Sequence, residues 1–215
     1  MSKVSEATDR LCDKGIVAVV RAQSSGQLID VARSLLAGGV DCIEITMTTP
    51  NALEVIRRCR QAVEGAMIGV GSVLDADTAD AAVEAGAQFV VSPIFDPAIV
   101  AKAHDREVPV VPGCFTPTEI HAATVVGADM VKVFPAGFFG PKFFKAILAP
   151  MPHLKLTPTG GVNLETAAAW IQAGAKTLGV GSALVTKKAL ADGDFDEIER
   201  LARQYVSIVA EARRN

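Results

Sequence analysis

The sequence predicts an α/β protein in which eight parallel strands and their helices close into a (β/α)₈ TIM barrel. The main observation is a unit that recurs along the chain: a short apolar run, a polar or glycine-bearing loop, and a longer amphipathic stretch. Strands that alternate with helices indicate a parallel sheet covered by helices. Eight such units, with almost continuously apolar strands, favour a closed barrel over an open doubly wound sheet.

The predicted strands are eight apolar runs, in chain order Ile16–Arg21, Cys42–Met47, Met67–Val70, Gln88–Ser92, Val108–Val111, Met130–Phe134, Leu154–Thr159 and Thr177–Val180. The stretches between them are rich in alanine and amphipathic, which predicts helices. Several of these stretches end in a glycine suited to a helix C-terminus, namely Gly38-Gly39, Gly86, Gly127 and Gly174.

Capping signals mark the starts of some predicted helices. Residues Thr116 to Glu119 read as a capping box with proline at the first helical position, and Asp96-Pro97 is a simpler version. The segment from Ser24 to Gln27 fits the same box more weakly. Residues 3–14 form a short amphipathic segment, expected to be an N-terminal helix that caps the barrel floor. No linker or low-complexity tract interrupts the chain, so residues 1–215 are predicted to be a single domain.

Composition excludes several classes of function. The chain has 215 residues, of which 50% are hydrophobic and 21% charged, enough apolar residues for a substantial core. A net charge of -3 argues against nucleic acid as the main partner. The apolar stretches are broken well before the roughly 20 residues that a membrane span requires, and the polar start of the chain lacks the apolar run of a signal peptide. We therefore expect a soluble cytoplasmic protein.

No metal or other cofactor is predicted. The four cysteines, Cys12, Cys42, Cys59 and Cys114, include no CxxC pair, and they are expected to be buried, reduced thiols. The three histidines, His104, His121 and His153, are scattered and lack the spacing of a metal-binding motif.

Lys132 interrupts a run that is otherwise apolar. Side chains alternate along a strand, so Lys132 shares a face with Met130 and Phe134. An ammonium in such surroundings is costly unless it is paired or loses its proton, and a neutral lysine amine can form a Schiff base with a carbonyl substrate. From this segment alone, a structural salt bridge or a side chain that reaches out at the strand end is equally compatible.

Glu44 lies within the second predicted strand. Burial raises the pKa of a carboxyl group, which suits it to proton transfer near neutral pH. The alternative is a structural ion pair with Lys132 or Arg21. A second ionisable group facing the same interior favours a chemical role.

Further candidates follow the ends of other strands, where barrels of this class have their active sites. Thr159-Gly160-Gly161 and Gly181-Ser182 follow the last two strands, the usual phosphate cradle of such barrels. The first pair of glycines opens onto Val162-Asn163, where the seventh helix is expected to begin. The other candidates are Arg21, which could bind a carboxylate or phosphate, Ser72, and Pro93 and Phe134, which would form an apolar wall or simply pack the barrel.

These residues match a known family in order over nearly the whole chain. The matching segments are Ile16–Arg21, Gly39–Thr46, Gly69–Val73, Val91–Pro93, Pro112–Glu119, Val131–Ala136, Pro158–Val162 and Gly181-Ser182. In these segments the chain resembles the 2-keto-3-deoxy-6-phosphogluconate aldolases. Some members of that family act on 4-hydroxy-2-oxoglutarate or on the phosphogalactonate analogue.

The resemblance implies a cofactor-free class I aldolase with a phosphorylated ketoacid substrate, commonly a homotrimer. Lys132 would form the Schiff base, and Glu44 would take the C4 hydroxyl proton, directly or through a water. Ser72 stands where the family usually has a threonine that contacts the pyruvate carboxylate. Pro93, Phe134 and Thr159 match positions around the ketoacid, and the two glycine loops match the phosphate site.

One departure from the family pattern concerns the carboxylate. Some members have an arginine after the second strand, where this chain has Thr48. We expect Arg21, on the neighbouring strand, to supply the missing charge. Two other classes remain open: a phosphosugar epimerase or isomerase, in which Lys132 and Glu44 shuttle protons without a covalent bond, and a non-catalytic barrel.

Overall fold

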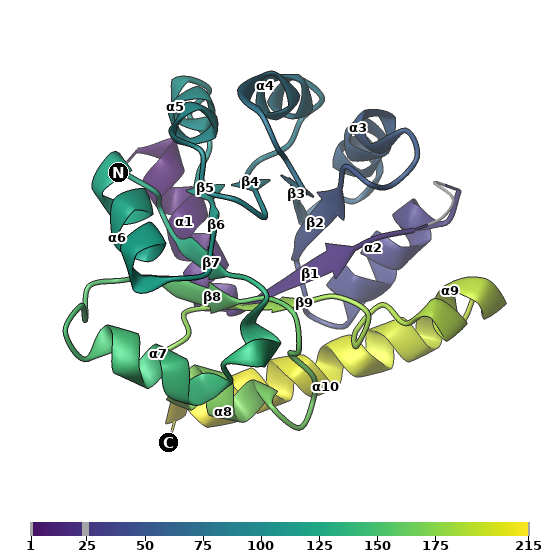
Figure 1. Ribbon diagram of the computed structural model, residues 1–215. Coiled ribbons are helices and arrows are strands. Elements are labelled where there is room, and N and C mark those ends of the chain that lie inside the picture. Colours follow the sequence, from purple (N-terminus) through teal and green to yellow (C-terminus); the bar gives the residue numbers. More distant parts are fainter. Residues whose placement is uncertain (1, 23–25, 215) are drawn as a thin grey trace.

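The computed structural model describes residues 2–22 and 26–214 and contains the predicted barrel (Figure 1). Its strands are β1 Ile16–Val20, β2 Cys42–Thr46, β3 Met67–Gly71, β4 Val90–Val91, β5 Val110–Val111, β6 Gly113–Cys114, β7 Val131–Val133, β8 Leu156–Pro158 and β9 Leu178–Val180. One sheet has the order β5-β4-β3-β2-β1-β9 and the other β6-β7-β8, with every pairing parallel. A bridge between Thr159 and Gly179 joins β8 to β9.

The fifth barrel strand is broken in two, which the sequence did not predict. β5 pairs with β4, and β6 pairs with β7, so the two short strands are successive halves of one crossing. Pro112 lies between them, and its missing N–H removes a donor from the ladder at that point. The apolar run Val108–Val111 predicted the first half, whereas Gly113-Cys114 has no strand signature of its own. Eight crossings therefore close the barrel, as expected.

Helices surround the strands (Figure 1). They are α1 Lys3–Lys14, α2 Leu28–Ala37, α3 Ala52–Ala62, α4 Ala76–Glu84, α5 Pro97–Asp105, α6 Pro117–Val126, α7 Pro141–Leu148, α8 Ala167–Gln172, α9 Lys187–Asp192 and α10 Phe195–Arg214, with a 3₁₀ turn at Ala136–Phe138. The long α10 packs against α2 and α8. No helix of the described residues is long and apolar enough to cross a membrane.

The two predicted capping signals that fall on described residues, at Thr116 and Asp96, are confirmed. The Thr116 hydroxyl accepts the N–H of Glu119, whose carboxylate accepts the N–H of Thr116, so α6 has both halves of its capping box. Asp96 caps α5 more simply, because its carboxylate accepts the N–H of Ala98 and no return bond is formed among the described residues. The weaker signal at Ser24 lies outside the described residues.

Alternation along the strands produces two apolar cores. One lies between the barrel and its helices, and the other fills the lower half of the barrel interior with Leu11, Val17, Cys42, Met67, Phe89, Val91, Val111 and Met130. Leu11 comes from α1 and is 1% exposed, so the N-terminal helix closes the barrel floor as expected. The upper half of the interior is left for polar side chains.

Candidate functional site

Lys132 lies on β7 and points into the barrel with only 5% of its surface exposed. Its register partners are Gly113 on β6 and Thr157 on β8. The Nζ atom lies 5.0 Å from the centroid of the Phe134 ring, which stands one pleat nearer the mouth and is 37% exposed. The predicted shared face of Met130, Lys132 and Phe134 is therefore present.

Glu44 lies on β2 and is 3% exposed. Burial raises the pKa of its carboxyl above the usual range, and the positive charges of Lys132 and Arg21 only partly offset this effect. Within the described chain, Glu44 and Lys132 take part in no salt bridge with each other or with any other residue. The structure thus lacks the ion pair that would explain either buried charge as a purely structural feature.

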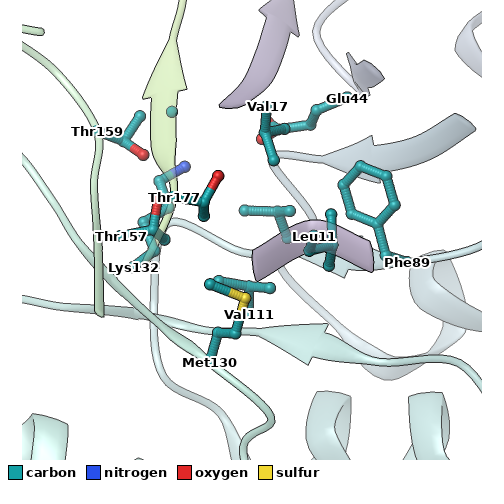
Figure 2. Close-up of a pocket in the computed structure, with 12 residues that line it drawn as sticks. Leu11, Val17, Glu44, Phe89, Val111, Met130, Lys132, Thr157, Thr159 and Thr177 are labelled. Atoms are coloured by element: carbon teal, nitrogen blue, oxygen red, sulfur yellow. The ribbon is translucent and has the colours of Figure 1, made fainter. Parts of the chain in front are cut away.

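Lys132 and Glu44 line the same small cavity inside the barrel. Figure 2 shows the two side chains extending into this space from opposite sides, with three threonine side chains around it. The cavity has a volume of about 20 Å³. Its polar lining consists of Glu44, Lys132, Thr157, Thr159 and Thr177, and Leu11 and Met130 are among its apolar walls.

A larger pocket of about 550 Å³ lies at the barrel mouth. Seven predicted site residues line it: Arg21, Phe134, Thr159, Gly160, Gly161, Gly181 and Ser182. Thr159 and Gly179 line both the mouth pocket and the interior cavity, so the two spaces are neighbours. The described lining of the mouth pocket includes two cationic side chains, Arg21 and Lys187, and no carboxylate. Its charge therefore favours an anionic ligand.

The glycine loop after β8 has a conformation that needs glycine. Gly160 and Gly161 have φ values of 85° and 80°, in the left-handed region. The expectation that a helix begins at Val162-Asn163 is wrong, because α8 starts only at Ala167. The side chains of Asn163 and Thr166 each accept the other residue's backbone N–H, at 2.9 and 3.0 Å, and form a closed turn in place of the first helical turn.

Three predicted site residues line neither space. Thr48 is exposed after β2 and lies within hydrogen-bonding distance, 2.9 Å, of the hydroxyl of Thr46. Ser72 follows β3 and has a positive φ of 60°. Pro93 follows β4 and lies against Gly113, where an added Cβ would overlap the proline backbone. All three are at the carboxyl ends of their strands but outside the two described linings.

The lining residues that the sequence reasoning missed include Thr157, Thr177 and Lys187. Thr157 and Thr177 gave no signal, because threonine is a common strand residue. Lys187 lies at the start of a helix and beside Lys188, where a pair of lysines suggests only a solvated surface. The distinguishing signal for the threonines is their position: each faces inward at the level where apolar side chains give way to polar ones.

The fold and the site define a (β/α)₈ barrel with a buried lysine and carboxylate beside a cation-lined mouth. Comparison with known families agrees: a family model described as KDPG and KHG aldolase matches residues 8–201. The chain belongs to this aldolase family, whose members are carbon–carbon lyases.

Individual relatives carry related names. The chain is 37% identical to a 2-dehydro-3-deoxy-phosphogluconate aldolase of Pseudomonas aeruginosa, over 96% of this chain and 95% of that one. It is 35% identical to the Treponema pallidum protein of the same name, over 97% and 99%. A 2-dehydro-3-deoxy-6-phosphogalactonate aldolase of Escherichia coli is 31% identical, over 90% and 92%.

A solved structure also matches closely. It is a KDPG aldolase from Legionella pneumophila with pyruvate captured as a covalent carbinolamine intermediate. It has a TM-score of 0.86 and 25% identity, over 92% of this chain and 96% of that one.

Proposed function

We propose that the protein is a class I aldolase that cleaves 2-keto-3-deoxy-6-phosphogluconate to pyruvate and glyceraldehyde 3-phosphate through a Schiff base on Lys132. The observation that carries the proposal is that Lys132 and Glu44 line one buried cavity next to a cation-lined pocket. The two side chains do not form a salt bridge with each other. The names of the relatives and the covalent pyruvate intermediate of the Legionella enzyme support the proposal.

The proposed reaction assigns a step to each buried group. The Lys132 amine attacks the C2 carbonyl, and loss of water yields the iminium, which serves as the electron sink. Glu44 takes the C4 hydroxyl proton, directly or through a water, as the C3–C4 bond breaks. The enamine is then protonated at C3, and hydrolysis of the imine releases pyruvate and regenerates the amine. The raised pKa of the Glu44 carboxyl suits a group that must both accept and return a proton.

The mouth pocket is proposed to hold the phosphate. Gly160, Gly161, Gly181 and Ser182 line it together with the cationic residues Arg21 and Lys187. Ser72, Pro93 and Thr48 stay predictions as ketoacid contacts, because they line neither space. Phe134, which stands over the lysine, would cover the ketoacid.

Reduction with borohydride in the presence of pyruvate tests the covalent step. We expect a pyruvate adduct on the peptide that contains Lys132, detected by mass spectrometry, and no adduct in Lys132→Arg. An unmodified Lys132 in an enzyme that still turns over a sugar phosphate would favour the epimerase or isomerase alternative. Neither adduct nor turnover would indicate a non-catalytic barrel.

Arg21 is proposed to bind the substrate carboxylate in place of the arginine that some family members have at the Thr48 position. If so, Arg21→Ala raises KM about tenfold for both 2-keto-3-deoxy-6-phosphogluconate and the unphosphorylated 4-hydroxy-2-oxoglutarate, since both have the carboxylate. Steady-state kinetics with both substrates measures this. A rise confined to the phosphorylated substrate would reassign Arg21 to the phosphate, and unchanged constants would exclude either role.

The proposal also names 2-keto-3-deoxy-6-phosphogluconate as the preferred ketoacid substrate. The relatives include enzymes named for the gluconate and the galactonate compound, which differ in configuration at one carbon. Assays of the two phosphorylated epimers and 4-hydroxy-2-oxoglutarate side by side will rank them by kcat/KM. A higher value for the galactonate compound would replace the gluconate assignment and leave the Schiff-base step untouched.

A further inference from the structure

The interior cavity contains a polar group that neither the fold nor the proposed reaction uses. Thr177 precedes β9 and is 1% exposed, and its Oγ1 has no hydrogen-bond partner among the described residues. Two other buried side-chain atoms share this condition, Trp170 Nε1 and Tyr205 OH, but both lie on outer helices. Thr177 alone of the three lines the cavity next to Lys132. A buried hydroxyl without a partner is costly, so its presence here requires an explanation.

The size and lining of the cavity match one water molecule. A buried water needs about 10–15 Å³ and two to four polar partners. The cavity offers about 20 Å³, too little for a substrate. Lys132, Thr157 and Thr177 are among the polar residues that line it, and each has a side-chain group that can bond to a water. Thr157 is the register neighbour of Lys132, and Thr177 lines the same cavity, into which Figure 2 shows both side chains projecting.

We propose that Thr177, together with Thr157, holds one water in this cavity, and that the water accepts a hydrogen bond from Nζ of Lys132. Thr177 is then a positioning residue, which acts on the lysine through the water. The inference rests on the proposed Schiff-base function.

The proposed water can accept a hydrogen bond from the Lys132 nitrogen both in the free amine and in the iminium. In the free amine, one N–H directed to the water oxygen fixes the amine and leaves the lone pair to attack C2 of the ketoacid. In the iminium, the nitrogen keeps a single N–H, which the same oxygen accepts. The two hydrogens of the water point to the threonine hydroxyls. No proton or electron is consumed by this arrangement, so the effect is confined to orientation and to stabilisation of the charged imine.

Two substitutions at Thr177 test the idea. Thr177→Val keeps the shape and removes the hydroxyl, whereas Thr177→Ser keeps the hydroxyl. We expect Val to lower kcat for cleavage, and the rate of borohydride-trapped imine formation with pyruvate, about tenfold, with KM within twofold of wild type. Ser should restore both rates to within twofold of wild type. Thr8→Val is the matched control, since Thr8 is equally buried but bonds to the carbonyl of Val4 on α1.

The outcomes separate this inference from the proposed function. An unchanged kcat in Thr177→Val, or a Ser variant as slow as Val, overturns the inference. A high-resolution crystal structure provides a test that needs no variant: an ordered water within hydrogen-bond distance of Nζ and Thr177 Oγ1 supports the inference, and a cavity without one overturns it. If the wild type forms no adduct at Lys132, the Schiff-base function itself fails.

Discussion

Gly71 determines where the Glu44 carboxylate can lie. It ends β3, next to β2, and a Cβ built on it would overlap Oε1 of Glu44. The missing side chain on β3 therefore provides the space that the Glu44 carboxylate occupies. Gly69, two residues earlier, makes room in the same way for the Phe89 ring. Glycine is normally an unfavourable strand residue, so the two glycines of β3 reflect the space that neighbouring side chains need.

We predict that Gly71→Ala lowers kcat/KM at least 100-fold, the effect expected when a general base is displaced. The new methyl group would force the Glu44 carboxylate or the strand to move, with a loss of about 1–3 kcal/mol in stability. Kinetics and urea unfolding measure the two effects. Gly26→Ala is the control, because among the described residues no atom beyond its chain neighbours lies within 4 Å of a Cβ at that position. Full activity in Gly71→Ala would contradict the placement of Glu44.

The buried carboxyl of Glu44 makes a second prediction, on pH. Burial raises its pKa in the folded state above the ordinary value of 4.5, so the folded protein binds this proton more tightly than the unfolded chain does. The stability that this carboxyl group contributes is fully present below its pKa in the unfolded chain. It is lost as pH rises through its pKa in the folded protein. Relative to wild type, Glu44→Gln should therefore gain stability as pH rises from 4, about 1.4 kcal/mol for each unit of pKa shift, and then level off.

Urea unfolding of wild type and Glu44→Gln at a series of pH values measures this difference. Glu54→Gln removes an exposed carboxyl from α3 and serves as the control. A stability difference that shrinks as pH rises would have the wrong sign for a buried carboxyl. In the proposed reaction, the loss of the base should also reduce kcat 100-fold or more.

The sequence revealed the buried charges but not the hydroxyls around them. Lys132 and Glu44 stand out because each interrupts an apolar run, and the structure brings both to one cavity. Thr157 and Thr177 look like ordinary strand residues, and only the closed barrel shows that they face the lysine. Ser72 and Pro93 were chosen because they follow strands, and Thr48 through the resemblance alone. None of the three lines either space, since loop conformation decides which strand-end side chains turn inward.

Among the connecting elements, α9 gives the mouth pocket a cation that no sequence motif indicated. Thr186 caps the helix through the N–H of Ala189, at 3.0 Å, so Lys187 is its first residue. Lys187 lines the pocket with the glycine loops, whereas Lys188 forms an ion pair with Asp192 along the helix. Two adjacent lysines thus have different neighbours because of where the helix begins.

We predict that Lys187→Met raises KM for 2-keto-3-deoxy-6-phosphogluconate about tenfold, through loss of a charged contact to phosphate. The constants for unphosphorylated 4-hydroxy-2-oxoglutarate should change less than twofold. Lys188→Met, the matched control, should leave both substrates unaffected. Equal losses for the two substrates would show that Lys187 acts on something other than the phosphate.

Element boundaries were the less predictable part of the fold. The start and end of α6 could be predicted, because a capping box and a C-terminal glycine, here Gly127, are typical of helix ends. The turn between Asn163 and Thr166 could not be predicted, since either residue could equally have started a helix. The break at Pro112 was also missed, because a proline beside a glycine normally signals the end of a strand.

For the molecule as a whole, repetition of the strand–helix unit was enough to predict the barrel, and the fold confirms it. The homotrimer implied by the resemblance stays a prediction. Exposed apolar side chains, including Phe138 at 82% and Leu74 at 58%, are the kind of surface that such an assembly could cover.

The closed floor has a consequence for the order of events during turnover. Leu11 and the apolar lower core seal one end, and in the described structure the interior cavity adjoins the mouth pocket through Thr159 and Gly179. In the proposed reaction, the aldehyde product and the bulk water that hydrolyses the imine must then use the same opening. If the proposed reaction holds, the aldehyde departs before that water arrives, and product release is ordered with pyruvate leaving last.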